Sequence, residues 1–341
     1  MPRDWALVVG IDRYPRAGVD PLEGAVGDAM RFHHWVTRPE GGGVDPGQAI
    51  LLTSPRQEEP GAIPRPMLAE IVGFFDELAY RLAGEPGRRL YIYLSGHGIS
   101  PSGQQSVRNA ALLMANAVKP NLLHNFPGNI WAEGVRSAAL FREVVLFMDC
   151  CRDLQNNAPL MPHMFGEPVE DSKDCYLLEA YATRWASKAR EQAFPPDDEL
   201  QGVFTRALLT VLDAGRMSAA VFRESVEAQL AELLADRHRA QEAEIRCAPE
   251  ARTLARLVFN EAAEEARSPV EIAGLAAPPV IEFWPEGADQ PEQVDIGGWR
   301  QEGGRWQGEL APGQYELRPP GGRPRRLKVH AGLATRLELA R

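Results

Sequence analysis

The chain has 341 residues, 44% of them hydrophobic and 25% charged, which is the composition of an ordinary water-soluble globular protein, and its length favours two domains. Its formal net charge of −10 disfavours a nucleic-acid partner, and because no apolar run approaches the length of a membrane span, we expect no transmembrane helix, no signal peptide and no membrane partner. The four cysteines form no CxxC pair, which argues against a zinc site and fits a reducing cytoplasm.

Apolar runs alternate with amphipathic patterns along most of the chain. In order, we expect a strand at 5–11, a helix at 22–36, a strand at 49–53, a helix at 65–82, a strand at 89–94, a helix at 129–141, strands at 144–148 and 176–183, helices at 202–209 and 218–241, and a last strand at 254–259. Residues 99–127 and 153–174 are expected to be irregular. Strands that alternate with helices predict an α/β fold, with a mostly parallel sheet and helices on both faces.

The composition changes near residue 277, where a segment rich in Gly, Pro, Trp and Arg begins. Short alternating strands are expected at 280–284, 305–310, 314–318, 326–330 and 335–339. The segment 278–341 is therefore predicted to be a small all-β domain. Its acidic and basic side chains nearly balance, so it adds no electrostatic case for nucleic-acid binding.

Two of the expected strands end at side chains that can do chemistry together. His97 follows the strand at 89–94, and Asp149, Cys150 and Cys151 follow the strand at 144–148. Ligands of open α/β sheets bind beyond the carboxyl ends of the strands, so both groups are well placed for a site. A neighbouring imidazole raises the thiolate fraction of a cysteine, which makes it a nucleophile.

Four short motifs accompany these strand ends. They are SGHG at 95–98, DCCR at 149–152, LEGAVGDA at 22–29 and GVFTRALL at 202–209. They resemble the histidine motif, the cysteine motif, the first-helix signature and a small-subunit helix of caspase-fold (clan CD) cysteine peptidases, bacterial metacaspase-like members in particular. The separation of His97 and Cys151 by 54 residues agrees with this, since caspases place the histidine roughly 50 residues before the cysteine.

The resemblance, which covers roughly residues 5–260, implies a caspase-like three-layer αβα sandwich over residues 1–265. Its parts would be a large-subunit-like region (1–152), a linker loop (153–174) and a small-subunit-like region (175–265), followed by the accessory β domain at 278–341. Asp153 departs from the family pattern, in which many relatives have a small residue, so the wall beside the site is expected to differ.

By the same resemblance, Cys151 attacks the scissile carbonyl and forms a thioester, while His97 protonates the leaving amine and then activates water. The backbone N–H groups of Gly98 and Cys151 are the implied oxyanion donors. Cys150 is the alternative nucleophile. The spacing from Asp149 and the following arginine favour Cys151, and Cys150 would then point to the opposite face as a small buried apolar side chain.

Asp28, Ser95 and Asp149 match positions that line the specificity pocket of metacaspases, which implies cleavage after Arg or Lys. A buried carboxylate pair would also repel an acidic substrate side chain. Two alternatives stay open for the carboxylates: Asp28 as a solvated helix residue and Asp149 as a cap on its turn. A further alternative is an Asp-specific protease whose pocket is lined by Arg152 or by arginines from loops.

The resemblance thus predicts a cytoplasmic bacterial endopeptidase that acts on protein substrates, in regulated proteolysis such as stress response, cell death or phage defence, with a regulatory protein as a further partner. The alternative from another class is a catalytically idle scaffold of the same fold. No cofactor or resident metal is expected. Calcium on the acidic loop is the weaker alternative, because the spacing of Glu167, Glu170, Asp171 and Asp174 fits no EF-hand.

Overall fold

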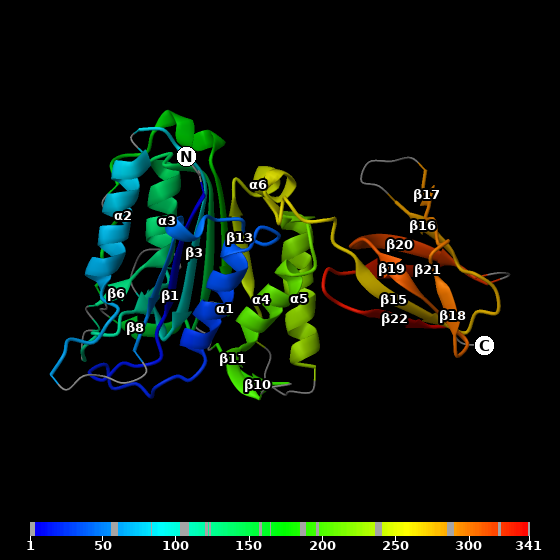
Figure 1. The fold of residues 1–341 in the computed structure, drawn as a ribbon, viewed down its shortest axis with the longest axis horizontal. Helices are drawn as coiled ribbons and strands as arrows, with labels where there is room; N and C mark the ends of the chain where they lie inside the picture. Colours follow the sequence, from blue (N-terminus) through cyan, green and yellow to red (C-terminus); the bar gives the residue numbers. More distant parts are fainter. Residues whose placement is uncertain are drawn as a thin grey trace.

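The computed structural model describes residues 4–55, 61–82, 84–102, 109–119, 122, 124–156, 159–163, 165–184, 189–195, 198–235, 241–284, 290–319 and 322–339. Six strands form a central sheet in the order β13-β9-β7-β3-β1-β2 (Figure 1). They are β1 (Asp4–Gly10), β2 (Ala49–Thr53), β3 (Gly87–Gly96), β7 (Phe141–Cys150), β9 (Tyr176–Tyr181) and β13 (Glu244–Ala248). Only β13 runs antiparallel to its neighbour, so the predicted mostly parallel sheet is confirmed.

Helices cover both faces of this sheet and make a three-layer αβα arrangement (Figure 1). One face carries α2 (Leu68–Leu82) and α3 (Gly128–Ser137), and the other carries α1 (Ala25–Thr37), α4 (Val203–Leu212) and α5 (Ala219–Leu233). Each face has its own buried apolar cluster. Within the described ranges, no helix has the length and apolar character needed to cross a bilayer.

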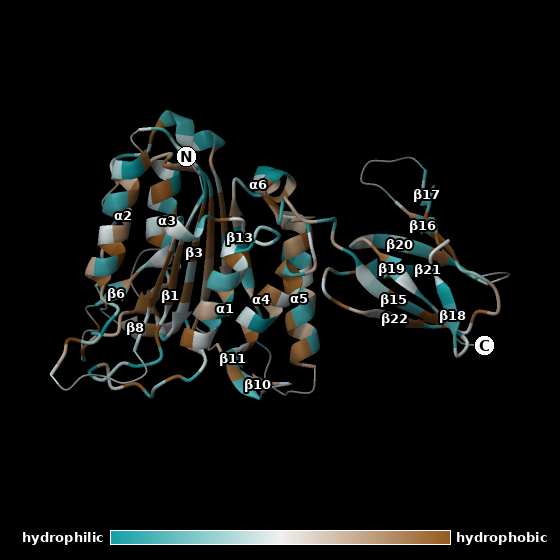
Figure 2. Ribbon diagram, in the orientation of Figure 1, coloured by the Kyte–Doolittle hydropathy of each residue, from teal (hydrophilic) through white to brown (hydrophobic). Residues whose placement is uncertain are grey.

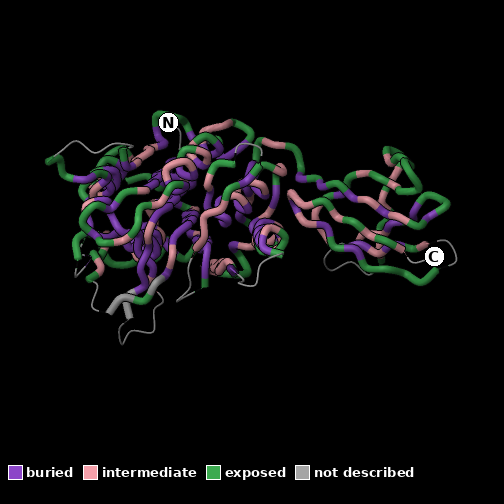
Figure 3. Tube along the Cα trace, turned by 90° about the horizontal axis from the view of Figure 1, so that it is seen from below, coloured by how far each residue is buried: buried purple, intermediate pink, exposed green. Residues whose placement is uncertain are grey.

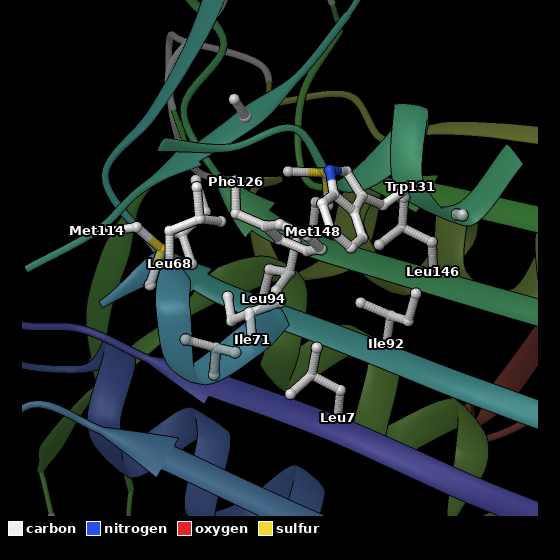
Figure 4. Close-up of a cluster of buried hydrophobic side chains, with 14 of the residues drawn as sticks. Leu7, Leu68, Ile71, Ile92, Leu94, Met114, Phe126, Trp131, Leu146 and Met148 are labelled. Carbon is white, nitrogen blue, oxygen red and sulfur yellow. The ribbon is translucent and has the colours of Figure 1, made fainter. Parts of the chain in front are cut away.

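The central strands are apolar throughout because both of their faces are covered. Figure 2 shows them as the most hydrophobic ribbons of the molecule, and Figure 3 shows the same region as buried. On the α2–α3 face, Leu94 and Met148 of adjacent strands lie close to Ile71 of α2 and Trp131 of α3 (Figure 4). Each fully buried side chain of this kind stabilises the fold by about 1.5–3 kcal/mol, so the sheet is a rigid base for the residues at its edge.

The two regions expected to be irregular contain short strands that form a second, smaller sheet. Its order is β6-β5-β4-β8, and its strands are β4 (Gly98–Ser102), β5 (Ala111–Leu113), β6 (Asn125–Phe126) and β8 (Asp153–Asn156). The region 153–174 also contains a 3-10 helix, Glu170–Asp174. These strands have two to five residues, too few for a clear alternation pattern in the sequence.

The strand predicted at 254–259 is wrong. Most of it belongs to α6 (Glu250–Arg256), and only β14 (Val258–Phe259) is extended, paired with β12 (Met217–Ser218). A short apolar run does not by itself distinguish a helix from a strand. Sequence analysis also did not identify the edge strand β13, or the hairpin of β10 (Glu191–Phe194) and β11 (Glu199–Gly202).

Two four-stranded sheets follow at the C-terminal end, ordered β18-β19-β15-β22 and β17-β16-β20-β21. Their strands are β15 (Ser268–Ala273), β16 (Val280–Phe283), β17 (Glu292–Gln293), β18 (Arg300–Glu302), β19 (Arg305–Leu310), β20 (Gly313–Arg318), β21 (Arg325–Val329) and β22 (Thr335–Glu338). They enclose a separate apolar cluster. This β region begins at β15, ten residues before the predicted start at 278, because β15 pairs with both β19 and β22.

The β region touches the αβα part through the turn after β21. Ala331 is fully buried, and its N–H donates to Ser225 Oγ of α5 at 2.9 Å. Lys328 forms an ion pair with Glu224 of α5 at 3.2 Å. Figure 1 shows the β region beside α5, on the side of the molecule away from β1 and β3.

Candidate active site

The register of two parallel ladders brings His97 and Cys151 to facing positions. In the ladder of β3 and β7, Gly96 pairs with Cys150, and in the ladder of β4 and β8, Ile99 pairs with Asp153. The partners in each pair are 54 positions apart, so the chain segments 96–99 and 150–153 keep one register between the two ladders. His97 and Cys151 occupy that gap, one residue beyond the last pair of the first ladder. The structure thus places the two predicted side chains on neighbouring strands at one sheet edge.

The loop between β1 and α1 holds the imidazole of His97. The backbone N–H of His97 donates to the phenolic oxygen of Tyr14 at 2.9 Å. The two aromatic rings meet edge to face, with 5.1 Å between their centroids. Nε2 of His97 lies 2.7 Å from the carbonyl oxygen of Asp20. Because a carbonyl oxygen only accepts, Nε2 carries the proton in this arrangement, and Nδ1 is the nitrogen available for proton transfer.

The two adjacent cysteines have different surroundings. Cys150 is buried in the apolar cluster of the α2–α3 face, and burial raises the pKa of its thiol strongly. Cys151 is only half-buried, and its Sγ accepts the backbone N–H of Ala189 at 3.3 Å. Its Sγ also donates to the carbonyl oxygen of Ala189 at 3.8 Å, so the backbone of Ala189 offers a partner to the thiol as well as to the thiolate, which is the nucleophilic form.

Gly98 lies directly against the cysteine turn. A Cβ atom at this position would overlap with the carbonyl oxygen of Cys151 and lie 2.6 Å from Cys150 Sγ. Only glycine allows the two chain segments to approach this closely. The backbone of Gly98 therefore runs beside the backbone of Cys151. This is required if the N–H groups of the two residues are to donate to the same oxyanion.

Two of the predicted pocket residues, Asp28 and Asp149, come together around Gly202. Both carboxyl groups are buried. A Cβ atom at Gly202 would overlap with Oδ2 of Asp149 and lie 2.9 Å from Oδ2 of Asp28. The Gly202 N–H donates to Asp28 at 2.7 Å, and Arg31 lies 3.2 Å from the other oxygen of Asp28. The expectation that Asp28 is a solvated helix residue is therefore wrong.

Asp149 is bound by the first turn of α4. Its Oδ2 accepts the N–H of Thr205 at 3.0 Å and the Thr205 hydroxyl at 2.6 Å. Ser95 pairs with Asp149 in the β3–β7 ladder and is itself buried. Tyr93 Oη lies 2.5 Å from Thr205 Oγ1, so a polar network on the α1–α4 face connects the two strands to α4. Asp149 thus binds the start of a helix from another part of the chain.

Burial and repulsion by neighbouring carboxylates raise the pKa of both groups. Desolvation is the largest cause for each, and it raises the pKa of Asp149 to about 6 although Thr205 donates to it. Burial and the charge of Asp149 raise the pKa of Asp28 well above its usual value. Glu191, on β10, adds a third negative charge that raises both pKa values further. Buried carboxyl groups with pKa values raised in this way are typical of functional sites.

Glu191 belongs to the same cluster of acidic side chains as Asp28 and Asp149, and sequence analysis did not identify it. Its two carboxylate oxygens accept the N–H groups of Gly24 at 2.9 Å and Glu23 at 3.3 Å, just before α1. Nothing in the local sequence around Glu191 marks it, because its partners lie far away in the chain. Tyr14, Asp20 and Ala189 were missed for the same reason, since each acts through a long-range contact with His97 or Cys151.

Arg152 is paired with Glu244 and not with Asp28 or Asp149. Its side chain is fully buried, donates to Glu244 of β13 at 2.5 Å, and lies over the ring of Tyr181 with 4.4 Å to the centroid. The guanidinium therefore connects the cysteine turn to the edge of the sheet. It is engaged by an acidic partner of the protein itself, which argues against its use as a receptor for an acidic substrate side chain.

The acidic loop at 167–174 has no arrangement of metal ligands in the structure. Glu170 forms an ion pair with Lys173, and Asp174 pairs with Arg252 at 2.8 Å. Across the described ranges, no group of three His, Cys, Asp or Glu side chains is placed to hold a metal ion.

The chain matches a model of the caspase domain over residues 3–253. A protein of a Desulfuromonadales bacterium, named as a probable protease, is 34% identical over 161 residues. That match covers 45% of this chain and 18% of the relative, so the chain spans less than a fifth of the length of that protein.

Two solved structures align with most of the chain at low identity. A Geobacter sulfurreducens protein aligns over 74% of this chain and 97% of its own, with 13% identity and a TM-score of 0.46. Caspase-1 from Spodoptera frugiperda aligns over 72% of this chain and 86% of its own, with 12% identity and a TM-score of 0.44.

Proposed function

Because the chain belongs to the family of caspase domains, we propose that it is a cysteine endopeptidase that cleaves protein substrates after arginine or lysine. The family and the relative named as a probable protease support proteolysis as the general activity. One observation carries the finer proposal. Two carboxyl groups, Asp28 and Asp149, are buried together on the α1–α4 face of the sheet, and Ala189, which donates to the Sγ of Cys151, packs on the same face.

In this proposal Cys151 Sγ attacks the scissile carbonyl, and the proton of the thiol passes to Nδ1 of His97. The imidazolium gives this proton to the leaving amine, which departs as the carbon–nitrogen bond breaks and a thioester remains. His97 then takes a proton from water, the hydroxide attacks the thioester and releases the acid as the carbon–sulfur bond breaks, and His97 returns its proton to the thiolate. The carbonyl of Asp20, which binds Nε2, keeps the ring in the tautomer that this sequence needs.

The N–H groups of Gly98 and Cys151 are the proposed donors to the oxyanion. The close approach of these two backbones supports the assignment, because both donors must converge on one oxygen. They are fixed by strand pairing on each side of the gap, so no reorganisation is needed when charge develops on the carbonyl oxygen.

The preference for a basic side chain follows from the charge of the proposed pocket. Asp28, Asp149 and Glu191 place three carboxyl groups near one another, and Arg31 is the cation paired with Asp28. An arginine or lysine of the substrate would supply the missing positive charge. An aspartate would add a fourth carboxylate to a desolvated region, which is strongly unfavourable.

Four fluorogenic peptides that differ only in the last residue test this preference. We expect cleavage after Arg and Lys, and at least about 100-fold lower kcat/KM after citrulline, which has the shape of arginine without its charge. The peptide that ends in Asp should not be cleaved. Cleavage after Asp, or equal cleavage after Arg and citrulline, would contradict the proposed pocket.

The pH dependence of this preference should follow the raised pKa of Asp149. Below a pH of about 6 this carboxyl group holds a proton, so its attraction for a basic side chain is lost. The ratio of kcat/KM for the Arg peptide to that for the citrulline peptide should be constant above pH 7 and fall below pH 6. Using the ratio cancels any effect of pH on the chemical steps that the two peptides share. A ratio that stays constant from pH 5 to 8 would rule out this role.

Tyr14 is the proposed positioning residue for His97. Tyr14→Phe removes the oxygen that accepts the backbone N–H of His97, and this leaves a partly buried donor unpaired. We expect kcat to fall about tenfold while KM changes little, because the imidazole moves but the carboxylates do not. Tyr80→Phe is the matched control, since Tyr80 is 85% exposed on α2. Equal kinetics in the two variants would exclude the positioning role.

A further inference from the structure

A cavity of about 700 Å³ lies against α1 and α4, and one of its lining residues, Arg31, also contacts Asp28. α1 and α4 supply most of its walls, the end of β11 contributes Gln201, and Gly332 of the β region closes one side. Its volume is in the range of small-molecule sites, and such sites often lie where two parts of a protein meet. The catalytic proposal uses one of its lining residues, Arg31, but assigns no role to the cavity itself.

Arginine side chains dominate the polar lining of the cavity. Arg31, Arg38 and Arg206 border it, while Asp213 is its one carboxylate among the described residues, in a chain whose net charge is −10. Arg38 forms an ion pair with Asp213, so that carboxylate is already engaged. Arg206 lies over the ring of Phe194 at 5.6 Å, and in the part of the chain that the structure describes no carboxylate is paired with it. A fixed guanidinium with unused donors is a ready receptor for an anion.

The same cavity also has an apolar side. Met30 is 54% exposed there, and Leu209 and Trp35 are further lining residues. A ligand that satisfies both sides has an anionic group and an apolar or aromatic body. Because the guanidinium fork matches phosphate oxygens in geometry and charge, we propose that this cavity is a regulatory site for a small organic phosphate.

Arg31 connects the cavity to the proposed substrate pocket, and this part of the inference rests on the proposed function. One nitrogen of Arg31 lies 3.2 Å from Asp28, and another lies 2.5 Å from Glu199. A phosphate in the cavity competes for this guanidinium and weakens its hold on Asp28. Asp28 and the neighbouring carboxylates then attract a basic substrate side chain more strongly. The ligand therefore lowers KM for Arg peptides and leaves kcat unchanged.

Binding is tested first, without any activity measurement. We would titrate the full chain with AMP, inorganic phosphate and adenosine in a calorimeter at low salt. AMP should bind with a Kd below about 1 mM, phosphate more weakly, and adenosine not detectably. Arg206→Gln should weaken AMP binding at least about tenfold. Arg223→Gln removes one arginine from α5, outside the cavity, and should change binding less than about twofold.

No saturable binding of AMP or phosphate, or equal AMP binding by Arg206→Gln and Arg223→Gln, would overturn the site. Steady-state kinetics with the Arg peptide then test the coupling. Saturating AMP should lower KM severalfold in the wild type but not in Arg206→Gln, with kcat the same in both. AMP binding that leaves KM unchanged would overturn the regulatory role. An enzyme without peptidase activity would contradict the proposed function, while the calorimetric result would still decide the phosphate site.

Discussion

Cys151→Ala should abolish peptide cleavage completely, because alanine has no atom that can form the thioester. His97→Ala should lower kcat by about 10²–10⁴-fold, the usual contribution of a general acid–base group. Both variants are expected to fold, since each side chain is only partly buried. Initial rates with the Arg peptide, compared at matched concentrations of folded protein, measure the two effects.

Cys150→Ala is the matched control for the nucleophile. Cys150 differs from Cys151 by one position but lies in the apolar cluster on the other face of the sheet. Its replacement should cost about 1 kcal/mol of stability and leave kcat/KM within a fewfold of the wild type. Activity that survives in Cys151→Ala and disappears in Cys150→Ala would transfer the nucleophile to Cys150.

Asp149→Asn should reduce kcat/KM for the Arg peptide by about 100-fold or more, because the basic side chain then loses a buried charged partner. Cleavage of the citrulline peptide should change little, since asparagine keeps the shape of the side chain and still accepts from Thr205. Asp76→Asn, an exposed change on α2, should affect neither peptide. If both peptides lose activity equally, Asp149 supports the fold of the site and does not select the substrate.

The same variant should be more stable than the wild type at neutral pH. The pKa of Asp149 is raised in the folded state, so its protonated form is the one that favours folding. That contribution is fully present below the unfolded value near 3.8 and is lost as the pH rises through about 6. The asparagine side chain carries no charge, so we expect Asp149→Asn to gain about 1–3 kcal/mol above pH 7, and the gain should shrink toward pH 4. Urea unfolding at both pH values measures this. A loss of stability above pH 7 would contradict the burial cost.

The family and the sheet could be predicted because their signals are local. The strands that end at His97 and Cys151 are continuous apolar runs, and the separation of 54 positions between the two residues matches the register by which Gly96 pairs with Cys150. A parallel pair that is buried on both faces leaves little freedom in its register. The motifs around these strand ends were therefore enough to predict the family, and the match to the caspase domain confirms that prediction.

The rest depends on contacts between distant segments, which no local pattern records. Glu191 lies near Asp28 only because the β10–β11 hairpin folds back to the start of α1. Tyr14 reads as an ordinary loop residue until Gly96, with a φ of 149°, turns the chain so that the His97 N–H meets its phenol. The strand β15 was missed because it begins with Ser268 and Pro269, and pairing with β19 and β22 on both sides overrides that weak local signal.

Covalent labelling tests the assignment of Cys151 and of the acidic pocket in one experiment. We would treat the protein with two peptidyl acyloxymethyl ketones that differ only in a terminal Arg or Asp, and map the adduct by mass spectrometry. We expect one adduct from the Arg reagent, located on Cys151, none in Cys151→Ala, and none from the Asp reagent. An adduct on Cys150 would contradict the assigned nucleophile, an adduct from the Asp reagent would contradict the acidic pocket, and no adduct at all would favour the idle scaffold.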